Sequence, residues 1–211
     1  MSMLHNPRDH WQRIYETRAP TAVSWYQPSP DRSLELIRFA NVPTDAAILD
    51  VGGGASTLVD HLLIAGFADV TVLDLASAAL AAAQARLGFD GARPKWIDAD
   101  ICEFQPSRQY DLWHDRAVFH FLVDPTRRDR YLHVLRQALR PEGHVIIATF
   151  SPAGPQQCSG LPVQRYGVDA LTELLGSNFR LIQSAVDTHV TPGGTRQEFA
   201  YGLWQHGAHR S

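Results

Sequence analysis

Short apolar runs alternate with segments of helical periodicity along most of the chain. Each apolar run ends in glycine or polar residues, which is typical of a buried parallel strand. The predicted strands are Ala47–Val51, Val70–Leu75, Lys95–Asp100, Tyr110–His114 and His144–Phe150. Apolar residues at helical spacing predict helices that begin near Asp31, Leu58, Ser77, Pro125 and Val168.

The order of these elements predicts the fold class. Strands that alternate with helices form a parallel, doubly wound sheet with helices on both faces. Two further strand-like runs, Phe179–Val190 and Thr195–Gln205, flank a Pro192-Gly193-Gly194 turn and are expected to pair as an antiparallel hairpin. We therefore expect an α/β protein with a Rossmann-like seven-stranded sheet and a C-terminal antiparallel hairpin. Residues up to Pro30 are predicted to be irregular and rich in aromatic side chains.

Composition and charge narrow the functional classes. The 211 residues carry a formal net charge of -3, which favours neither nucleic acid nor an anionic membrane as a partner. The arginines at 127, 128 and 130 are interpreted as a solvated helix face. The N-terminus lacks the apolar core of a signal peptide, and no apolar run approaches the roughly 20 residues needed to span a bilayer. A cytoplasmic protein is the default expectation, and the spacing of Cys102 and Cys158 predicts no metal site.

The first strand leads into a glycine-rich turn flanked by acidic residues. Asp50-Val51-Gly52-Gly53-Gly54 lets the backbone turn sharply and approach a ligand, and Asp74 ends the next strand. Ligands of open α/β sheets bind beyond the carboxyl ends of the strands, where a carboxylate accepts hydrogen bonds from a ribose diol. This arrangement predicts a cofactor that carries a ribose.

The charges around the turn distinguish between cofactors. Asp50 repels a pyrophosphate and attracts an ammonium or a sulfonium, and Thr57 replaces the third glycine of the dinucleotide pattern. Lys95 is the only lysine of the chain. This disfavours a nicotinamide oxidoreductase, which would use a tyrosine–lysine pair, and it also disfavours a Walker A loop.

Four segments together resemble the motifs of class I S-adenosylmethionine-dependent methyltransferases. They are Asp50–Gly54, Leu73-Asp74-Leu75, Asp98-Ala99-Asp100-Ile101 and the Leu139–His144 turn. The resemblance covers roughly residues 45–150 and implies S-adenosylmethionine as cofactor, with S-adenosylhomocysteine as product. It implies that Gly52, Gly53 and Gly54 face the methionine part.

The same resemblance assigns the remaining cofactor contacts. It implies that Asp74, followed by Leu75, binds the ribose, that Asp100 binds the adenine amino group and that Ile101 packs on the ring. The alternative for Asp100 is a turn or cap residue.

The segment after the fourth strand is expected to border the cofactor and the acceptor. His114 and Asp115 are the candidates for proton transfer, His114 also as a cofactor contact, and Arg116 for binding the acceptor. The alternative is an Asp115–Arg116 ion pair, with His120 as a core residue. A general base is optional, because in-line methyl transfer gains much of its rate from positioning.

Two other segments are candidates for covering the pocket. Tyr15 and Trp25 are expected to form a lid over the sulfonium, with Tyr26 at the substrate; the alternative is that these rings only cover the core. In the long loop 151–166, Arg165 is expected to bind an anionic group of the acceptor.

These observations predict one methyltransferase domain over residues 1–211. It comprises an aromatic lid segment (1–30), a cofactor-binding core (45–150) and a closing loop, helix and hairpin (151–211). We expect transfer to an unidentified nucleophile, a small molecule. A protein lysine and a non-catalytic S-adenosylmethionine-binding protein stay open, as does the oligomeric state.

Overall fold

The protein has a seven-stranded mixed sheet at its centre. The computed structural model describes residues 6–207. The strand order is β3-β2-β1-β4-β5-β9-β8, with β1 to β5 parallel and β9 antiparallel to both β5 and β8. The strands span Ala47–Val51 (β1), Asp69–Asp74 (β2), Lys95–Asp98 (β3), Tyr110–Arg116 (β4), Leu139–Phe150 (β5), Phe179–Val190 (β8) and Arg196–His206 (β9). The Rossmann-like fold with its closing hairpin is confirmed.

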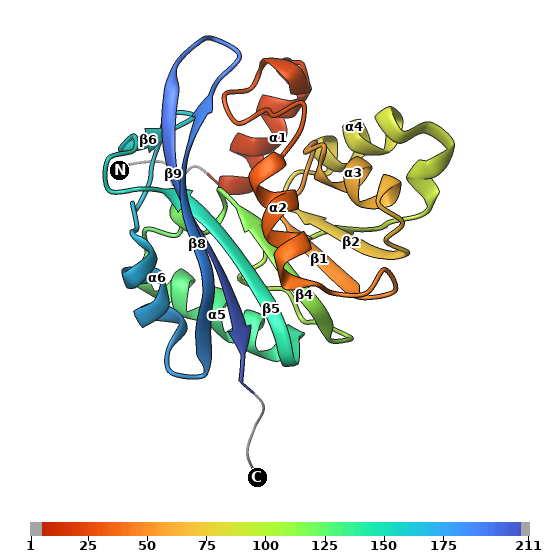
Figure 1. Ribbon diagram of the computed structural model, residues 1–211. Helices are drawn as coiled ribbons and strands as arrows, with labels where there is room; N and C mark the ends of the chain where they lie inside the picture. The colour runs from red at the N-terminus through yellow and green to blue at the C-terminus, as the bar shows by residue number, and fades with distance from the viewer. Residues whose placement is uncertain (1–5, 208–211) are drawn as a thin grey trace.

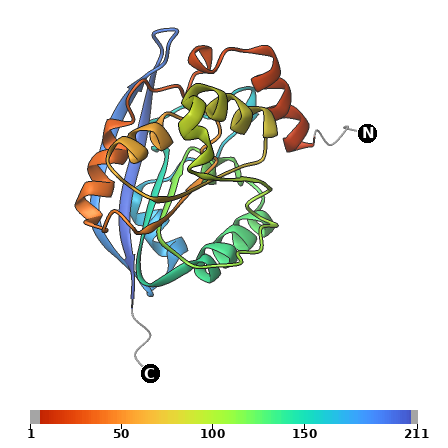
Figure 2. The ribbon, with the colours of Figure 1, turned by 90° about the vertical axis from the view of Figure 1, so that its right-hand side faces the viewer.

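Helices cover both faces of the sheet, as Figures 1 and 2 show. One buried cluster joins α2, α3 and α4 to the face that carries Ile48 and Leu112. A second cluster joins α5 and α6 to the face that carries Leu49 and Trp113. The helices span Pro7–Thr17 (α1), Asp31–Ala40 (α2), Leu58–Ile64 (α3), Ser77–Leu87 (α4), Pro125–Ala138 (α5) and Val168–Leu175 (α6). This alternation follows from the period of two in a strand, which sends adjacent side chains to opposite faces.

The strand register aligns the residues of the expected site. Val51 pairs with Leu73 of β2 and with Asp115 of β4, while Asp50 pairs with His114. The carboxyl ends of β1, β2 and β4 therefore meet at one edge, where the glycine turn, Asp74 and the segment after β4 converge.

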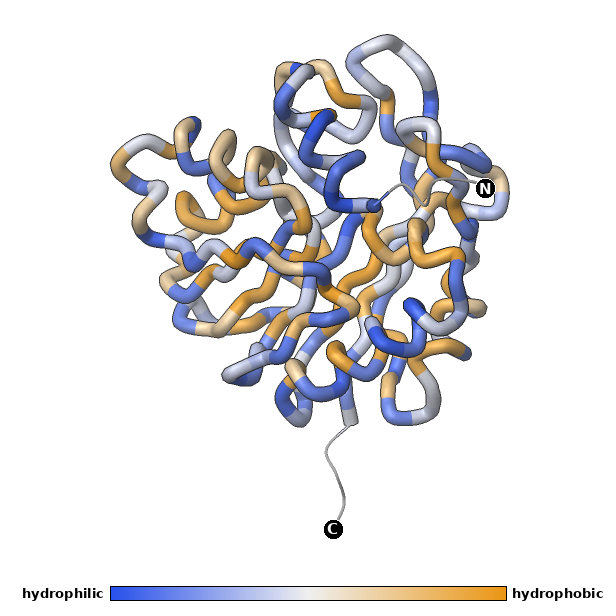
Figure 3. The backbone as a smooth tube through the Cα atoms, turned by 180° about the vertical axis from the view of Figure 1, so that it is seen from behind, coloured by the Kyte–Doolittle hydropathy of each residue, from blue (hydrophilic) through white to orange (hydrophobic). Residues whose placement is uncertain are grey.

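The N-terminal segment differs from the sequence expectation. Residues expected to be irregular form α1, which begins at Pro7 after a cap in which Asn6 accepts a hydrogen bond from the backbone of Arg8. A short 3-10 helix, Pro20–Ala22, follows. Figure 1 places α1 at the end of the sheet opposite to the last residues of β9. It is mostly polar (Figure 3), but Trp11, Ile14 and Tyr15 recur at helical spacing, a signal that the sequence expectation overlooked.

Ser77 was expected to cap α4, but it is the first residue of that helix. The backbone N–H of Ala78 donates instead to the side-chain oxygen of Gln12, 3.1 Å away in α1. A side chain of α1 therefore satisfies an N-terminal donor of α4, which ties the N-terminal segment to the sheet.

The long loop after β5 contains a small hairpin. β6 (Gln157–Cys158) and β7 (Leu161–Pro162) pair antiparallel. Short 3-10 turns occur at Gly88–Ala92 and Phe119–Phe121. Within residues 6–207, no helix has both the length and the apolar character that a membrane span requires. The thiols of Cys102 and Cys158 are both buried and free.

Candidate active site

The glycine turn after β1 has no room for side chains. Gly52 and Gly54 have φ angles of +65° and +41°, which L side chains rarely adopt. A Cβ atom on Gly52 would collide with Val118, and one on Gly54 would lie 2.6 Å from Oδ2 of Asp74. The backbone N–H of Gly52 donates to the carbonyl of Leu73 at 2.7 Å. The turn therefore packs tightly against the end of β2 and offers its backbone to a ligand.

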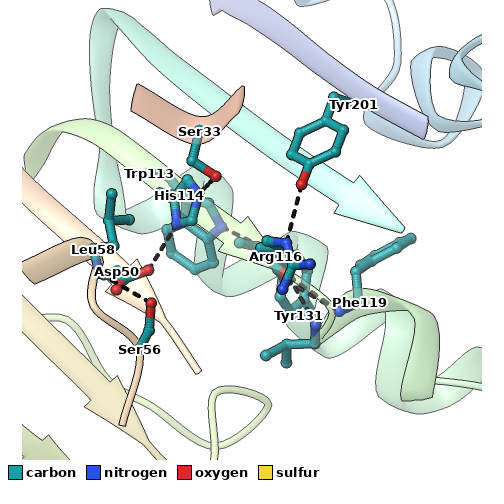
Figure 4. Close-up of polar contacts among 12 residues, drawn as sticks. Ser33, Asp50, Ser56, Leu58, Trp113, His114, Arg116, Phe119, Tyr131 and Tyr201 are labelled. Atoms are coloured by element: carbon teal, nitrogen blue, oxygen red, sulfur yellow. Dashed lines mark hydrogen bonds and ion pairs between the residues drawn. The ribbon is translucent and has the colours of Figure 1, made fainter. Parts of the chain in front are cut away.

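Asp50, the residue before the last of β1, is buried and has one free carboxylate oxygen. Nδ1 of His114 donates to its Oδ1 at 2.7 Å, and Nε2 of His114 lies 2.9 Å from the hydroxyl of Ser33 (Figure 4). Oδ2 is buried and has no hydrogen-bond partner among residues 6–207. A Cβ on Gly53 would collide with this oxygen. A buried carboxylate oxygen without a donor suits a cation such as an ammonium group.

Asp74 is the second carboxylate of the turn. Its Oδ1 accepts a hydrogen bond of 2.8 Å from the backbone of Ala76. Burial raises its pKa to about 7, the bond from Ala76 opposes this shift, and the charge of Asp50 adds to it. Hydroxyl groups that donate to Asp74 would favour its charged form, so a ribose diol fits this position.

A cavity of about 320 Å³ brings most of the expected cofactor residues together. Its walls come from α1, the ends of β1, β2 and β4, the segment after β4 and the β6–β7 hairpin. The expected residues that line it are Tyr15, Trp25, Gly52, Asp74, Leu75, Asp100, Ile101 and Arg116.

A smaller cavity of about 50 Å³ adjoins the glycine turn. Asp50, Gly53, His114 and Tyr26 line it, together with other residues, and none of these four lines the larger cavity. Tyr15, Trp25, Gly52 and Arg116 line both cavities, so the two spaces share a wall. Gly54 is not among the lining residues of either and acts by leaving room for Asp74.

Asp100 is a turn residue that also lines the larger cavity. Its Oδ1 accepts from the backbone N–H of Cys102 at 2.9 Å, as a turn residue does, and the residue also lines the larger cavity. Its Oδ2 accepts from Arg127 Nη2 at 2.7 Å. Arg127 lines the cavity as well, so the expectation of a solvated face is wrong for this arginine. The pair joins residues 27 positions apart in sequence, and no local pattern could have predicted it.

Asp115 lies beneath the site rather than on its wall. It is fully buried, and its carboxylate accepts from the backbone N–H groups of Val118 at 2.9 Å and Phe119 at 3.1 Å. The hydroxyl of Tyr131 donates to it at 2.6 Å. Adjacent strand residues face opposite sides of a sheet, so His114 points toward α2 and Asp115 toward α5. The structure thus separates two residues that the sequence placed together at the reacting edge.

The alternative considered for this segment was an Asp115–Arg116 ion pair with His120 in the core, and only its second part holds. Asp115 and Arg116 form no ion pair in the described part of the chain. His120 is a core histidine: it is fully buried, burial lowers its pKa to about 3, and its Nδ1 accepts from the backbone of Phe150.

Arg165 does not reach the site. Its Nη1 donates to the backbone carbonyls of Pro152 at 2.8 Å and Gly154 at 3.2 Å, and it lines neither cavity. It therefore holds the loop after β5 in place, which differs from the expected contact with an acceptor.

The N-terminal aromatic residues cover the larger cavity. Nε1 of Trp25 donates to the hydroxyl of Tyr15 at 3.0 Å. The ring of Trp11 packs edge-on against Trp25 and Phe121, with centroid distances of 5.5 and 4.9 Å. Nε2 of His189 donates to the carbonyl of Ser24 at 2.7 Å, which attaches the segment to the C-terminal hairpin. Sequence reasoning missed Phe121, because only the folded chain brings it against Trp11.

Comparison with known proteins agrees with this geometry. The family model described as a methyltransferase domain matches residues 49–145. The EEF1A lysine methyltransferase 2 of Danio rerio is 26% identical over 190 residues, which cover 82% of this chain and 79% of that protein.

Solved structures share the fold. The N-methyltransferase NodS of Bradyrhizobium japonicum, in complex with S-adenosyl-L-homocysteine, gives a TM-score of 0.71 at 16% identity, covering 94% of this chain and 99% of that one. The 1,6-didemethyltoxoflavin-N1-methyltransferase of Burkholderia thailandensis gives a TM-score of 0.71 at 19% identity. The match covers 98% of this chain and 93% of that one.

The strand order, the glycine turn between two carboxylates and the family match define a class I S-adenosylmethionine-dependent methyltransferase. The match to the methyltransferase-domain model, residues 49–145, covers the part of the chain that carries the glycine turn, Asp74 and Asp100. Its cofactor, when bound, supplies an electrophilic methyl group on a sulfonium. The free oxygen of Asp50 and the position of Asp74 fit the ammonium and the ribose of that cofactor.

Proposed function

We propose that this methyltransferase acts on a small molecule, which binds in the part of the larger cavity that is covered by the N-terminal aromatic residues. One observation carries the proposal: a single cavity runs from Asp74 to the rings of Trp11, Trp25 and Phe121. Its wall on that side also includes Leu161 of the β6–β7 hairpin. A ligand enclosed in this way is sheltered from water beside the cofactor site.

The residues of the site act by holding the reactants rather than by moving protons. The described lining of the larger cavity contains no histidine, lysine or glutamate. Its two aspartates, Asp74 and Asp100, lie on the cofactor side. The acceptor is therefore a nucleophile that reacts without a protein base, and alignment of the reacting atoms supplies the acceleration.

A protein lysine is the second candidate, and the similarity to the lysine methyltransferase of Danio rerio favours it. A solved structure with the same fold, the N1-methyltransferase of Burkholderia thailandensis, instead holds a small molecule, 1,6-didemethyltoxoflavin, together with S-adenosylhomocysteine. The acceptor side of the cavity presents the cation of Arg116, and both aspartates of the lining lie on the cofactor side. A cationic lysine side chain would gain no counter-ion there, which supports the small-molecule assignment.

The test uses S-adenosylmethionine labelled in its methyl group and a cell extract split by size into metabolites and proteins. We expect the label to pass into acid-soluble compounds made from the metabolite fraction. Label that accumulates only in acid-precipitable protein, on lysine, would overturn the proposal. Gly54→Ala serves as the inactive control, because its Cβ would displace Asp74.

A further inference from the structure

Arg116 is half-buried at the boundary between the two cavities. Its Nε donates to the hydroxyl of Tyr201 at 3.0 Å (Figure 4), and its Nη1 donates to the carbonyl of Trp25 at 3.1 Å. The guanidinium lies 4.5 Å from the ring centroid of Phe199. Nη2 is buried and has no partner among the residues that the structure describes. The Nη2 group of the guanidinium is thus available to donate hydrogen bonds to a ligand.

Among the described residues, no carboxylate lies within ion-pair distance of the positive charge of Arg116. Its charge contributes to the pKa shifts of three buried or half-buried groups, His120, His189 and Cys158. Burial lowers the pKa of both histidines and raises that of Cys158 to about 11, so these groups are uncharged near neutral pH. Burying an uncompensated cation is costly, and an anionic ligand would offset this cost.

The other arginine of the cavity is already paired. Arg127 donates to Asp100 at 2.7 Å on the cofactor side. Arg116 is therefore the cation that faces the compartment of Trp11, Trp25 and Phe121 without a carboxylate partner among the described lining residues. A guanidinium surrounded by apolar rings suits a flat molecule that carries a carboxylate. Guanidinium and carboxylate groups match in geometry, and the rings can pack against the flat part of the molecule.

We infer, on the basis of the proposed small-molecule function, that the methyl acceptor is an aromatic acid whose carboxylate binds Nη2 of Arg116. The ring of the acid lies among Trp11, Trp25 and Phe121, next to the cofactor site. Arg116 thus selects the acceptor by its charge and holds it in place. The nucleophilic atom belongs to the rest of the acceptor.

The test measures binding of benzoate and of its neutral analogue benzamide to the protein saturated with S-adenosylhomocysteine, by calorimetry. Wild type is expected to prefer benzoate by at least about tenfold, and Arg116→Gln to reduce the preference to within about twofold. Arg116→Lys keeps the positive charge but lacks the planar guanidinium, so this variant should retain part of the preference for benzoate. Arg180→Gln is the matched control, because Arg180 contacts Gln205 on the far hairpin and should leave the preference unchanged.

Three results would overturn the inference. Equal binding of benzamide would show that the pocket does not select an anion. Persistence of the preference in both Arg116 variants would place the anion elsewhere. A loss of S-adenosylhomocysteine affinity in Arg116→Gln, with unchanged affinity for 5′-methylthioadenosine, would show that Arg116 binds the cofactor's own carboxylate. The labelled-extract experiment is independent of all three, so the acid preference can fail while transfer to small molecules stands.

Discussion

Nδ1 of His114 donates a hydrogen bond of 2.7 Å to Oδ1 of Asp50, and this bond leaves the other carboxylate oxygen free beside the glycine turn. His114 is itself held from α2 through Ser33. The histidine that was expected to move a proton is therefore engaged in fixing the carboxylate of the turn. We propose that in this position it sets which oxygen of Asp50 is offered to the ammonium group of the cofactor.

Replacing His114 by phenylalanine should weaken binding of the amino-acid part of the cofactor. We expect affinity for S-adenosylhomocysteine to fall about tenfold more than affinity for 5′-methylthioadenosine, which lacks the ammonium group. Calorimetry on both ligands measures the difference. Ser33→Ala keeps the bond to Asp50 and should change both affinities by no more than about twofold. Equal losses for the two ligands in His114→Phe would contradict the role given to His114.

The ionisation of Asp74 should make nucleoside binding depend on pH. Its pKa is raised to about 7 in the ligand-free protein, so the charged form that accepts from a diol becomes dominant as pH rises. Affinity for 5′-methylthioadenosine is expected to increase about tenfold from about pH 6 to about pH 8. Asp74→Asn should bind more weakly and lose this dependence. A flat pH profile in the wild type would show that Asp74 does not bind the ligand as a carboxylate.

The same group should lower the stability of the ligand-free protein above neutral pH. A carboxyl group whose pKa is higher in the folded than in the unfolded state stabilises the fold while protonated, and this contribution is lost as pH rises through about 7. At about pH 8, Asp74→Asn is expected to be more stable than wild type by on the order of 2 kcal/mol. Denaturant unfolding at about pH 4 and pH 8 tests this. A variant that is less stable than wild type at the higher pH would refute it.

Gly54 should be intolerant of a side chain for a reason specific to the site. Its Cβ would lie 2.6 Å from Oδ2 of Asp74, so Gly54→Ala is expected to lower affinity for S-adenosylhomocysteine by roughly a hundredfold or more. Gly194 also has a positive φ angle, +81°, but has open space where its Cβ would lie. Gly194→Ala therefore carries the backbone strain alone and should bind normally. If Gly54→Ala and Gly194→Ala lost similar amounts of affinity for S-adenosylhomocysteine, backbone strain would be responsible and displacement of Asp74 would not.

Asp115 is predicted to act in folding rather than in proton transfer. It accepts from the backbone of Val118 and Phe119 and from Tyr131 in the core, so Asp115→Asn loses the bond from the tyrosine hydroxyl. We expect the free energy of unfolding to fall by about 2–4 kcal/mol. Urea unfolding measures it, alongside methyl transfer by the folded fraction. Wild-type stability combined with lost transfer would restore the catalytic interpretation.

The sequence predicted those parts of the site whose chemistry is local. A glycine turn after an apolar strand and a carboxylate at the next strand end are short-range patterns, and helix α6 (Val168–Leu175) was located to the residue. Contacts between distant segments could not be predicted in this way. Trp11 meets Phe121, and Arg127 meets Asp100, only after the chain has folded.

The role of Asp115 shows where one-dimensional reasoning fails. His114 and Asp115 are neighbours at the end of one strand, and the sequence offered no reason to separate them. In the sheet, the period of two sends them to opposite faces, where Ser33 contacts one and Tyr131 the other. Only one of the two can face the crevice beside the glycine turn.

The acidic groups at the glycine turn should select a cationic amino-acid nucleoside over a diphosphate. Titration of the purified protein with S-adenosylhomocysteine and with NADH tests this directly. We predict saturable binding of S-adenosylhomocysteine and no detectable heat with NADH. Tight binding of NADH, without measurable affinity for S-adenosylhomocysteine, would contradict the selectivity attributed to these acidic groups.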